Sequence, residues 1–450
     1  MHARLIRHGL GFAALLAALV AHPRAAHAQS AAAAPTSEPV AARVTLDQCI
    51  AAALAQNIDL LTTADDVAVA ESQRNSMRGQ FGPKLHVDGS YTRWNEAYVF
   101  DGFPVHGATV WNVTASVTQP ITALFAIYDA FKVRDLGVDI AMVKHEASRR
   151  QTAYRVIEAY YRLLQAERLA EVAVASVDQL TTQLRQANSF HANGVVSQDD
   201  VLRAELAVAN AQQRLIQSRA RITIDRAQLA VLMGTPPDST IEAQPLAGDA
   251  VPPREAASLE QAEQTAEAHR IELREVEKRI EQAHHDSRLA YLKLAPQVSA
   301  VGAYIHNEGS LFSQVNAGYI GGVASWDVWD WGTTTSGIGE AKARAHQALL
   351  ARSKVDDQIK LEVREAFVGV GTASEALVVA KAAVAAAEEN FRLVKKRYEA
   401  NAATSFDVVD AEGLLTQARG QMETARYDYL IAHAALRAAM GGAPETLARD

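Results

Sequence analysis

Cysteine is nearly absent from the sequence: Cys49 is the only one among 450 residues, which excludes a disulfide within the chain. Proline is missing between Pro120 and Pro236 and again between Pro296 and Pro444. Because proline in a helix interior removes a hydrogen bond and clashes with the preceding turn, its absence leaves both intervals free to form very long helices. A chain without disulfides needs rigidity from another source, such as coiled-coil packing or oligomerisation.

Long apolar runs are also scarce. After residue 28 the sequence has no run of about eighteen uncharged apolar residues, the length that a membrane-spanning helix needs. The Ala- and Val-rich stretch near 376–387 is interrupted by Lys381. An exported protein of this kind is periplasmic, secreted, or a β-barrel of an outer membrane.

Residues 1–28 have the pattern of a secretory signal peptide. Arg4 and Arg7 precede an apolar run, and residues 26–28 (Ala-His-Ala) form a cleavage site. Cleavage removes three arginines and takes the formal net charge from −8 to −11, which argues against nucleic acid as a partner. Because no cysteine follows the cut, the signal gives no sign of a lipid anchor.

Motifs that carry catalysis are lacking. The sequence contains no Gly-rich phosphate loop, no nucleophile elbow, no Cys–His set and no metal ligands at suitable spacing. His284 and His285 are adjacent, so they cannot face the same side of a helix. We therefore expect no enzyme activity, no cofactor and no metal site.

The mature chain is a tandem duplication. A helix-opening capping box at 45–48 recurs 213 residues later at 258–261, and beyond about residue 110 the offset becomes 207. The second offset pairs Glu205 with Glu412. The predicted order is a flexible leader (29–42), a first repeat (43–234), a proline-rich linker (235–256), a second repeat (257–442) and a tail (443–450).

In each repeat the short helix is followed by a pair of strand-like segments, at about 84–93 and 110–120 and again at about 297–306 and 315–329. In the first pair, apolar and polar residues alternate, as in a strand between lipid and a wet lumen. An amphipathic hairpin on a soluble core has the same alternation. The second pair is weaker, because its return segment is rich in glycine.

All five tryptophans lie near predicted strand ends, where a membrane-interface girdle would place them. Packing at the edge of a soluble sheet is the alternative explanation. The predicted interface residues are Trp94, Trp111, Trp326 and Trp329.

Each strand pair is followed by a helical hairpin, at about 130–233 and 337–441. The 63 residues from 130 to 192 would extend roughly 95 Å as one helix. A heptad-like seam is predicted from Val156 through Tyr160 and Leu163 to Val174 and Leu184. Because such narrow seams bury little surface, the helices need neighbours, including other copies of the chain.

The two hairpin tips are one element repeated. Gly194 corresponds to Asn401, and both residue types tolerate the left-handed conformation that ends a helix. Ser197 corresponds to Thr404, where a cap for the returning helix belongs.

Carboxylates follow these caps. Asp407 and Asp410 are one turn apart and can share a face, whereas the first tip has Asp199, Asp200 and Arg203. Acids at a helix N-terminus are also favoured by the macrodipole alone. If copies assemble around an axis, rings of carboxylates at a narrow mouth would attract cations and set selectivity.

Over residues 43–442 the chain resembles the TolC-like outer-membrane efflux protein family. The most specific part runs from Tyr398 through 405–411 (Ser-Phe-Asp-Val-Val-Asp-Ala) and 425–430 (Ala-Arg-Tyr-Asp-Tyr-Leu) to Met440. The resemblance implies a mainly α fold with a transmembrane β-barrel. Three protomers would each give four strands to one 12-stranded barrel, and their helices would form a periplasmic tunnel.

The resemblance also assigns the site. Asp407 and Asp410 match an acidic constriction at the periplasmic end, and Asp200 and Tyr398 match residues that tie the closed tip. Ala403 stands where the best-known member has an arginine, so we carry no ion pair across. Implied partners are outer-membrane lipid, a periplasmic adaptor and an inner-membrane pump.

We therefore predict a homotrimeric, passive exit duct in the outer membrane, serving efflux or type I secretion and gated at the periplasmic tip. The alternative is a periplasmic adaptor or coiled-coil scaffold without a pore. An adaptor would normally have one helical hairpin and a membrane tether, whereas this chain has two hairpins and two strand pairs.

Overall fold

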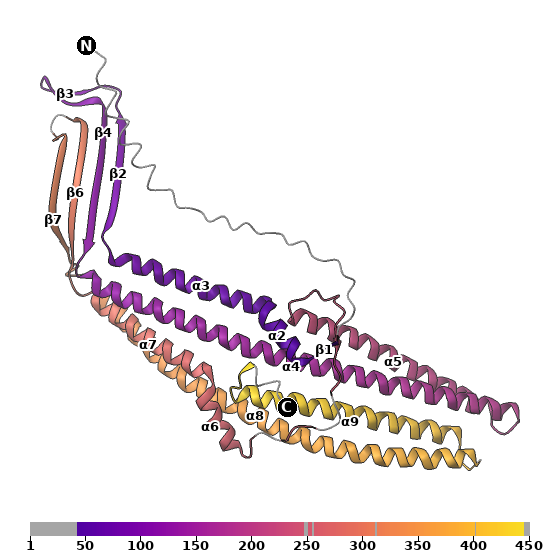
Figure 1. The fold of residues 1–450 in the computed structure, drawn as a ribbon. Helices are drawn as coiled ribbons and strands as arrows, with labels where there is room; N and C mark the ends of the chain where they lie inside the picture. The colour runs from indigo at the N-terminus through magenta and orange to yellow at the C-terminus, as the bar shows by residue number, and fades with distance from the viewer. Residues whose placement is uncertain (1–42, 247–250, 254–255, 311–312, 401, 445–450) are drawn as a thin grey trace. The chain divides into compact units, whose positions relative to one another are not determined.

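The computed structural model describes residues 43–246, 251–253, 256–310, 313–400 and 402–444. The predicted signal peptide (1–28) and leader (29–42), Asn401, and residues 445–450 of the tail lie outside the described residues. The described residues form one compact unit, which is mainly helical (Figure 1). The predicted mainly α fold with a small sheet in each chain is confirmed, whereas the shared 12-stranded barrel of a trimer stays a prediction.

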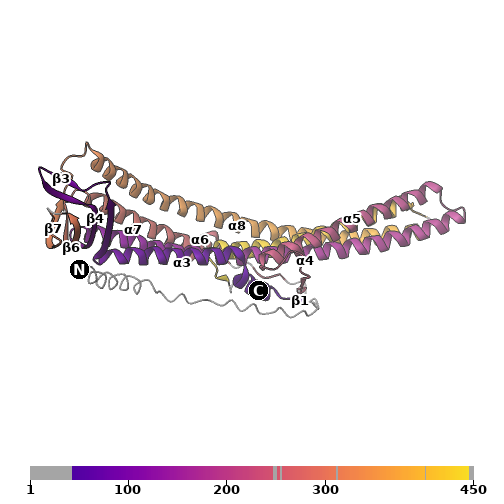
Figure 2. The ribbon, with the colours of Figure 1, turned by 90° about the horizontal axis from the view of Figure 1, so that it is seen from above.

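The helices of the two repeats follow the same order. The first repeat has α2 (Leu46–Gln56), α3 (Ile58–Arg78), η1 (Gly79–Phe81), α4 (Ala123–Ala192) and α5 (Gln198–Leu232). The second has α6 (Leu259–His269), α7 (Ile271–Leu292), α8 (Thr333–Glu399) and α9 (Ser405–Ala439). Near the sheet the helices pack in the order α3–α4–α7–α8, and toward the tips in the order α5–α4–α9–α8 (Figures 1 and 2).

Both long helices begin earlier than the sequence pattern indicates. Helix α4 starts at Ala123 because the chain turns sharply after β4: the backbone N–H of Ile121 donates to the carbonyl of Val298 (2.9 Å). Helix α8 starts at Thr333, where Asp330 accepts hydrogen bonds from the backbone of Thr334 (2.7 Å). Neither anchor is part of an apolar repeat.

The buried seam of α4 differs from the prediction toward the tip. Val156, Tyr160 and Leu163 are buried as expected, but Val174 is 47% exposed. The residues that α4 buries there are one position earlier: Ala173, Ser176, Leu180, Gln183 and Ala187. Helix α4 contacts both α5 and α9 at this level, and the stripe between two neighbours includes polar residues that an apolar pattern omits.

Five strands form an antiparallel sheet (Figure 1). They are β2 (Lys84–Arg93), β3 (Tyr98–Phe100), β4 (Phe103–Pro120), β6 (Gln297–Ser310) and β7 (Asn316–Ser325). The order is β2-β4-β6-β7, and β3 pairs with β4 off this path. Outside the sheet, β1 (Arg43–Val44) and β5 (Glu242–Ala243) form a short parallel pair beside the linker.

Two bounds of the sheet differ from the sequence prediction. Strand β4 begins at Phe103 rather than near residue 110, because the chain forms the extra strand β3 and turns through Asp101 (φ 49°) and Gly102 (φ 80°). Strand β7 ends at Ser325 rather than near residue 329. The next residue, Trp326, donates its indole N–H to the carbonyl of Leu294 (3.1 Å) and leaves the sheet.

In the described part of the chain, one helix, α8, contains a segment long and apolar enough to cross a membrane by length and composition alone. Helix α8 packs along α9 and α7, and its Ala- and Val-rich stretch contains Lys381. We therefore assign this segment to the helical bundle.

The duplication is also visible in two equivalent joints. At each joint, the break between two consecutive helices (α2 and α3, or α6 and α7) contacts the C-terminal end of a returning helix (α5 or α9). In the first joint, between α2 and α3, Asn57 donates its side-chain N–H to the carbonyl of Leu232 (2.9 Å). Asn57 also caps α3 by accepting from the backbone of Asp59 (3.0 Å). Gly234 lies beside it with φ +75°, and a Cβ there would overlap the backbone of Gln56.

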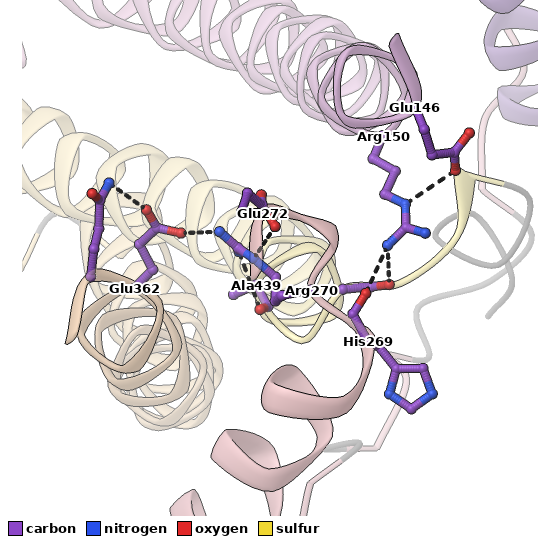
Figure 3. A network of polar contacts seen from close by, with 9 residues as sticks. Glu146, Arg150, His269, Arg270, Glu272, Glu362 and Ala439 are labelled. Carbon is purple, nitrogen blue, oxygen red and sulfur yellow. Dashed lines mark hydrogen bonds and ion pairs between the residues drawn. The ribbon is translucent and has the colours of Figure 1, made fainter. Parts of the chain in front are cut away.

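The second joint has the same geometry but uses charges (Figure 3). Arg270, the counterpart of Asn57, donates to the carbonyl of Ala439 (3.3 Å) and pairs with Glu362 (2.6 Å). Arg150 of α4 donates to the carbonyls of His269 (3.1 Å) and Gly441 (2.9 Å). One joint is thus held by a neutral amide and the other by arginines.

Candidate functional site

The first hairpin tip is closed by its predicted residues. Gly194 has φ +73° and donates to the carbonyl of His191 (2.9 Å), which ends α4. The hydroxyl of Ser197 accepts from the backbone N–H of Asp200 (3.3 Å), and one oxygen of Asp200 accepts from the backbone N–H of Ser197 (3.2 Å). This reciprocal capping box starts α5.

The second tip repeats the capping box. One oxygen of Asp407 accepts from the backbone N–H (2.7 Å) and the hydroxyl (2.8 Å) of Thr404. These two hydrogen bonds hold the pKa of the Asp407 carboxyl below its usual range, so the carboxylate remains charged. Asp410 is exposed one turn further along α9. Both predicted caps, Ser197 and Thr404, therefore have aspartate partners.

Tyr398 is the most deeply buried predicted residue of the tip, at 2% exposure. Its hydroxyl, the hydroxyl of Ser405 and the side-chain nitrogen of Gln183 are all buried without a hydrogen-bond partner. Burial raises the pKa of Tyr398, and the charge of Asp200 raises it further, while Ser405 and Gln183 lower it. The three polar groups are therefore close neighbours, but no hydrogen bond of good geometry joins them.

Asp200 and Tyr398 are not hydrogen-bonded to each other, and one oxygen of the Asp200 carboxylate caps α5. The contacts between the two tips are aromatic instead. The ring of Phe190 lies 5.6 Å from that of Tyr398, and the guanidinium of Arg203 lies 6.0 Å from the ring of Phe406. Arg203 is also paired with Asp199 of its own helix (2.8 Å).

Sequence reasoning missed four of these contact residues. Gln183 and Phe190 are one heptad apart on α4, and Ser405 and Phe406 begin α9. A signal was present in the spacing of Ser176, which is one further heptad from Gln183 on the same stripe. That signal was hidden because Val174 and Val177, one position later than Ala173 and Ser176, fit the same spacing with more apolar side chains.

We expect Tyr398→Phe to leave the stability of the protein unchanged or to raise it slightly, by up to about 1 kcal/mol, because the lost hydroxyl has no partner. Tyr398→Ala should lower it by about 3 kcal/mol through the cavity it leaves. Denaturant unfolding of the detergent-purified protein measures both. A phenylalanine variant as unstable as the alanine variant would show that the hydroxyl ties the tip.

The sheet has one continuous apolar face in its first half. The register places Leu85 opposite Val117 and Tyr91 opposite Trp111 on one face. His86 is opposite Ser116 on the other face. The second half, β6 and β7, is less regular. On β6, the polar residues His306 and Glu308 lie on the same face as Tyr91 and Trp111. On β7, the exposed apolar residues Tyr319 and Val323 lie on the opposite face.

The tryptophans lie at opposite ends of the sheet. Trp94 follows β2 and lies 5.1 Å from the ring of His106, and Trp111 donates its indole N–H to Glu308 (2.6 Å). Trp326 and Trp329 follow β7 at the end from which α8 starts, and both are exposed. The sheet therefore has aromatic side chains at both of its ends.

The profile of the outer membrane efflux protein family matches residues 49–235 and 262–442, one segment in each repeat. The chain belongs to this family. It is accordingly an outer-membrane efflux channel protein with a periplasmic helical part. The members of this family are channels rather than enzymes. The alternative prediction, an adaptor or scaffold without a pore, is not favoured.

Curated relatives cover most of the chain at low identity. The toluene efflux pump outer membrane protein TtgC of Pseudomonas putida is 23% identical over 421 residues, which are 88% of this chain and 83% of the relative. Nodulation protein T of Rhizobium leguminosarum bv. trifolii is 20% identical over 404 residues, 88% and 85% of the two chains.

Solved structures have the same fold. The outer membrane protein VceC of Vibrio cholerae has a TM-score of 0.77 at 19% identity and covers 88% of this chain and 96% of its own. The CmeC outer membrane channel of Campylobacter jejuni has a TM-score of 0.79 at 16% identity and covers 91% of both chains.

Proposed function

We propose that three copies of this chain assemble into a passive exit duct, the outer-membrane component of a tripartite efflux pump or a type I secretion system. Strands β2, β4, β6 and β7 of each copy would form one 12-stranded barrel, and the long hairpins would form a tunnel in the periplasm. The repeats predicted at 43–234 and 257–442 would each supply two strands and one hairpin.

The observation that carries this proposal is that the sheet has an unpaired strand edge on each side, so that one copy can pair with the next. The sheet ends in β2 on one side and β7 on the other, and neither outer edge has a strand partner among the described residues. An open sheet edge is not stable in lipid, so the strands must close into a barrel. In closing, β7 of one copy pairs with β2 of the next.

The helical edges match in the same way. Helices α3 and α5 lie along one edge and α8 along the other, and each exposes large apolar side chains. They include Leu61 and Val69 on α3, Leu202, Leu206, Ile216, Ile224 and Val231 on α5, and Leu349, Leu350, Leu361, Val368, Val378 and Val379 on α8. Edges that complement each other head to tail close into a ring.

The sheet has the right height for a bilayer. From Trp326 at the helix end to Trp111 near the far end is about a dozen strand positions, or roughly 40 Å along the strand. At the usual tilt of about 40° this spans about 30 Å, the thickness of the hydrocarbon core. We assign Trp94, Trp111, Trp326 and Trp329 to the two membrane interfaces.

The tips would form the gate. We assign Asp407 and Asp410 to a ring of carboxylates at the periplasmic mouth, with Asp200 and Tyr398 at the contact between hairpins. Energy would come from an inner-membrane pump, joined to the tips through a periplasmic adaptor. These partners follow from the family and not from any contact in this chain.

Trimer formation can be tested on an unheated denaturing gel of outer-membrane fractions. We expect a band at three times the chain mass that collapses to a monomer on boiling, and single channels in planar bilayers from the unheated material. Soluble monomers without channel activity would refute the proposed function.

A further inference from the structure

Helices α8 and α9 form an apolar recess on one face of the second hairpin. Its volume is about 1100 Å³, and Leu169 of α4 also lines it. Small side chains make up most of the lining: Gly369, Ala373 and Ala376 on α8, and Gly420, Ala425 and Ala432 on α9. A smaller recess of about 560 Å³ adjoins the first, and Glu365, Gly369 and Ala432 line both.

The packing of the chain does not require the two glycines of the larger recess. Gly369 and Gly420 lie in helix interiors, where glycine is roughly 1 kcal/mol less favourable than alanine. A Cβ at Gly369 would have nothing within 4 Å, and one at Gly420 would reach only ordinary contact with Leu169 (3.7 Å). The space in front of these residues therefore stays open although a larger residue would stabilise each helix.

The first hairpin has larger residues at two equivalent positions. The offset of 207 relates Gly369 to Arg162 and Ala376 to Leu169. Arg162 extends to Asp428 of α9 (3.0 Å), and Leu169 lines the recess of the second hairpin. The recess is thus a property of the second repeat and does not follow from the duplicated fold.

The recess and the linker lie on different faces of α9. The linker is fixed by Tyr429, which donates to the carbonyl of Pro252 (2.6 Å), and by His433, whose Nε2 donates to the carbonyl of Pro253 (3.2 Å). Asp428, one position before Tyr429, lines the recess instead. Because a duct must keep its interior clear, we place the linker outside the proposed tunnel. The recess then faces the lumen, where only a molecule passing through can reach it.

Most charged residues that line the two recesses are paired with an opposite charge. The pairs are Arg364–Glu263 (3.2 Å), Asp428–Arg162 (3.0 Å), Arg150–Glu146 (3.3 Å), Arg270–Glu272 (3.0 Å) and Arg270–Glu362 (2.6 Å). Figure 3 shows the last three.

Glu365 is the exception among these charges. It lines both recesses, and its exposed carboxylate has no ion pair or hydrogen bond within the described part of the chain. A few polar groups placed beside an apolar surface set the orientation and the charge of the ligand that the surface binds. An apolar recess with one uncompensated carboxylate therefore fits a molecule that has an apolar body and one positive charge.

We propose that this recess is a binding site for amphiphilic organic cations on their way through the duct. The apolar body of the molecule lies between α8 and α9, and its positive charge lies near Glu365. The inference rests on the proposed trimeric duct, which has one such site in the inner wall of each chain. Binding is weak, because the recess is open on one side and a conduit must release what it binds.

Tetraphenylphosphonium and tetraphenylborate are matched probes, because the two ions have nearly the same shape and opposite charges. Equilibrium dialysis against the purified trimer in lipid nanodiscs measures the binding of each ion, with protein-free nanodiscs as the blank. We expect the phosphonium to bind saturably at one site per chain. The borate should bind at least about fivefold more weakly, because the carboxylate of Glu365 repels it.

Two variants separate the apolar contribution from the charge. Gly369→Leu fills the recess and should weaken phosphonium binding by more than about tenfold. Glu365→Gln keeps the shape of the side chain and removes its charge, so phosphonium binding should weaken about threefold and the preference for the cation should disappear. The controls are Gly413→Leu on α9 and Glu375→Gln on α8, which are exposed positions outside the recess and should change neither value.

Thiol protection locates the probe without relying on these variants. Thr372→Cys places a thiol in the lining of the recess, and Ser374→Cys places one on the same helix outside it. Saturating phosphonium should remove most of the reactivity of the first thiol toward a maleimide and none of the second. Burial raises the pKa of the native Cys49 thiol to about 12, so this residue remains unreactive.

Three results would overturn the inference: equal binding of the two ions, phosphonium binding that Gly369→Leu leaves unchanged, or equal protection of the two thiols. A fourth would show that the next chain's α5 fills the recess through Leu361 and Val368, which also line it. In that case no phosphonium would bind, and Gly369→Leu would weaken the trimer on an unheated gel.

The unheated gel and the channel recording of the same sample report separately on the proposed function. If the protein forms no trimer and no channel, the duct itself is refuted. If the trimer conducts but binds no phosphonium, only the inference about the recess fails.

Discussion

Replacing Asp407 and Asp410 with alanine should weaken, by more than about tenfold, the block of the channel that multivalent cations cause from the periplasmic side. The reason is that three copies would remove six carboxylates from one narrow mouth. The structure places both side chains at the exposed start of α9, and the hydrogen bonds from Thr404 keep Asp407 charged. Titration of the block in planar bilayers measures the effect.

The control for this experiment is Glu399→Ala, which removes another exposed acid close to the same tip. It should leave the block nearly unchanged. An equal loss in both variants would mean that general tip charge, rather than the proposed ring, attracts the cation. An unchanged block in the double aspartate variant would remove the reason for placing the gate at Asp407 and Asp410.

The same block has an expected dependence on pH. The folded-state pKa of Asp407 is depressed, so its charge is present above that pKa and is lost only as the pH falls through it. The contribution of Asp407 should therefore persist at pH values at which an ordinary aspartate is protonated. In Thr404→Ala, which removes the hydroxyl donor, that contribution should disappear at a higher pH.

The largest loss of stability is expected for Gly234→Ala. The residue has φ +75°, and an added Cβ would lie 2.7 Å from the carbonyl carbon of Gln56, so both the backbone and the first joint would have to move. Separation of this joint would also break the hydrogen bond from Asn57 to Leu232. We expect a cost of about 3–5 kcal/mol in the free energy of unfolding.

Gly194→Ala is the matched control, because Gly194 has nearly the same backbone angle (φ +73°) with nothing within 4 Å of the added Cβ. It should cost only the backbone strain, about 1 kcal/mol. Denaturant unfolding of both variants in detergent makes the comparison. Equal losses would show that strain, and not the collision at the joint, decides the effect.

The sequence was sufficient for the features that repeat. The offset of 207 identified the two hairpins, and residue types with known backbone preferences, Gly194 and Ser197, located the end of one helix and the start of the next. The family and the mainly α fold were predicted correctly from the resemblance, which rested on the duplicated layout and on the residues from Tyr398 to Met440. The roles of Asp407 and Asp410 in gating stay predictions, because one chain does not contain the ring.

The features that the sequence did not predict depend on pairs of distant residues. The start of α4 is set by a hydrogen bond to Val298, and the seam toward the tip runs through Ser176 and Gln183 because two helices contact α4 there. Strand β3 is short and is defined by its pairing with β4. None of these has a periodic apolar signal that a single sequence could reveal.

Helix α4 is one uninterrupted rod of 70 residues, or about 105 Å. The residue Ile121, just before the helix, is hydrogen-bonded to Val298 at the base of the sheet, and the last turn of α4 carries Phe190 at the tip. No loop therefore interrupts the helix between the sheet and the tip. We therefore expect a displacement of the tip to be transmitted along α4 to the sheet.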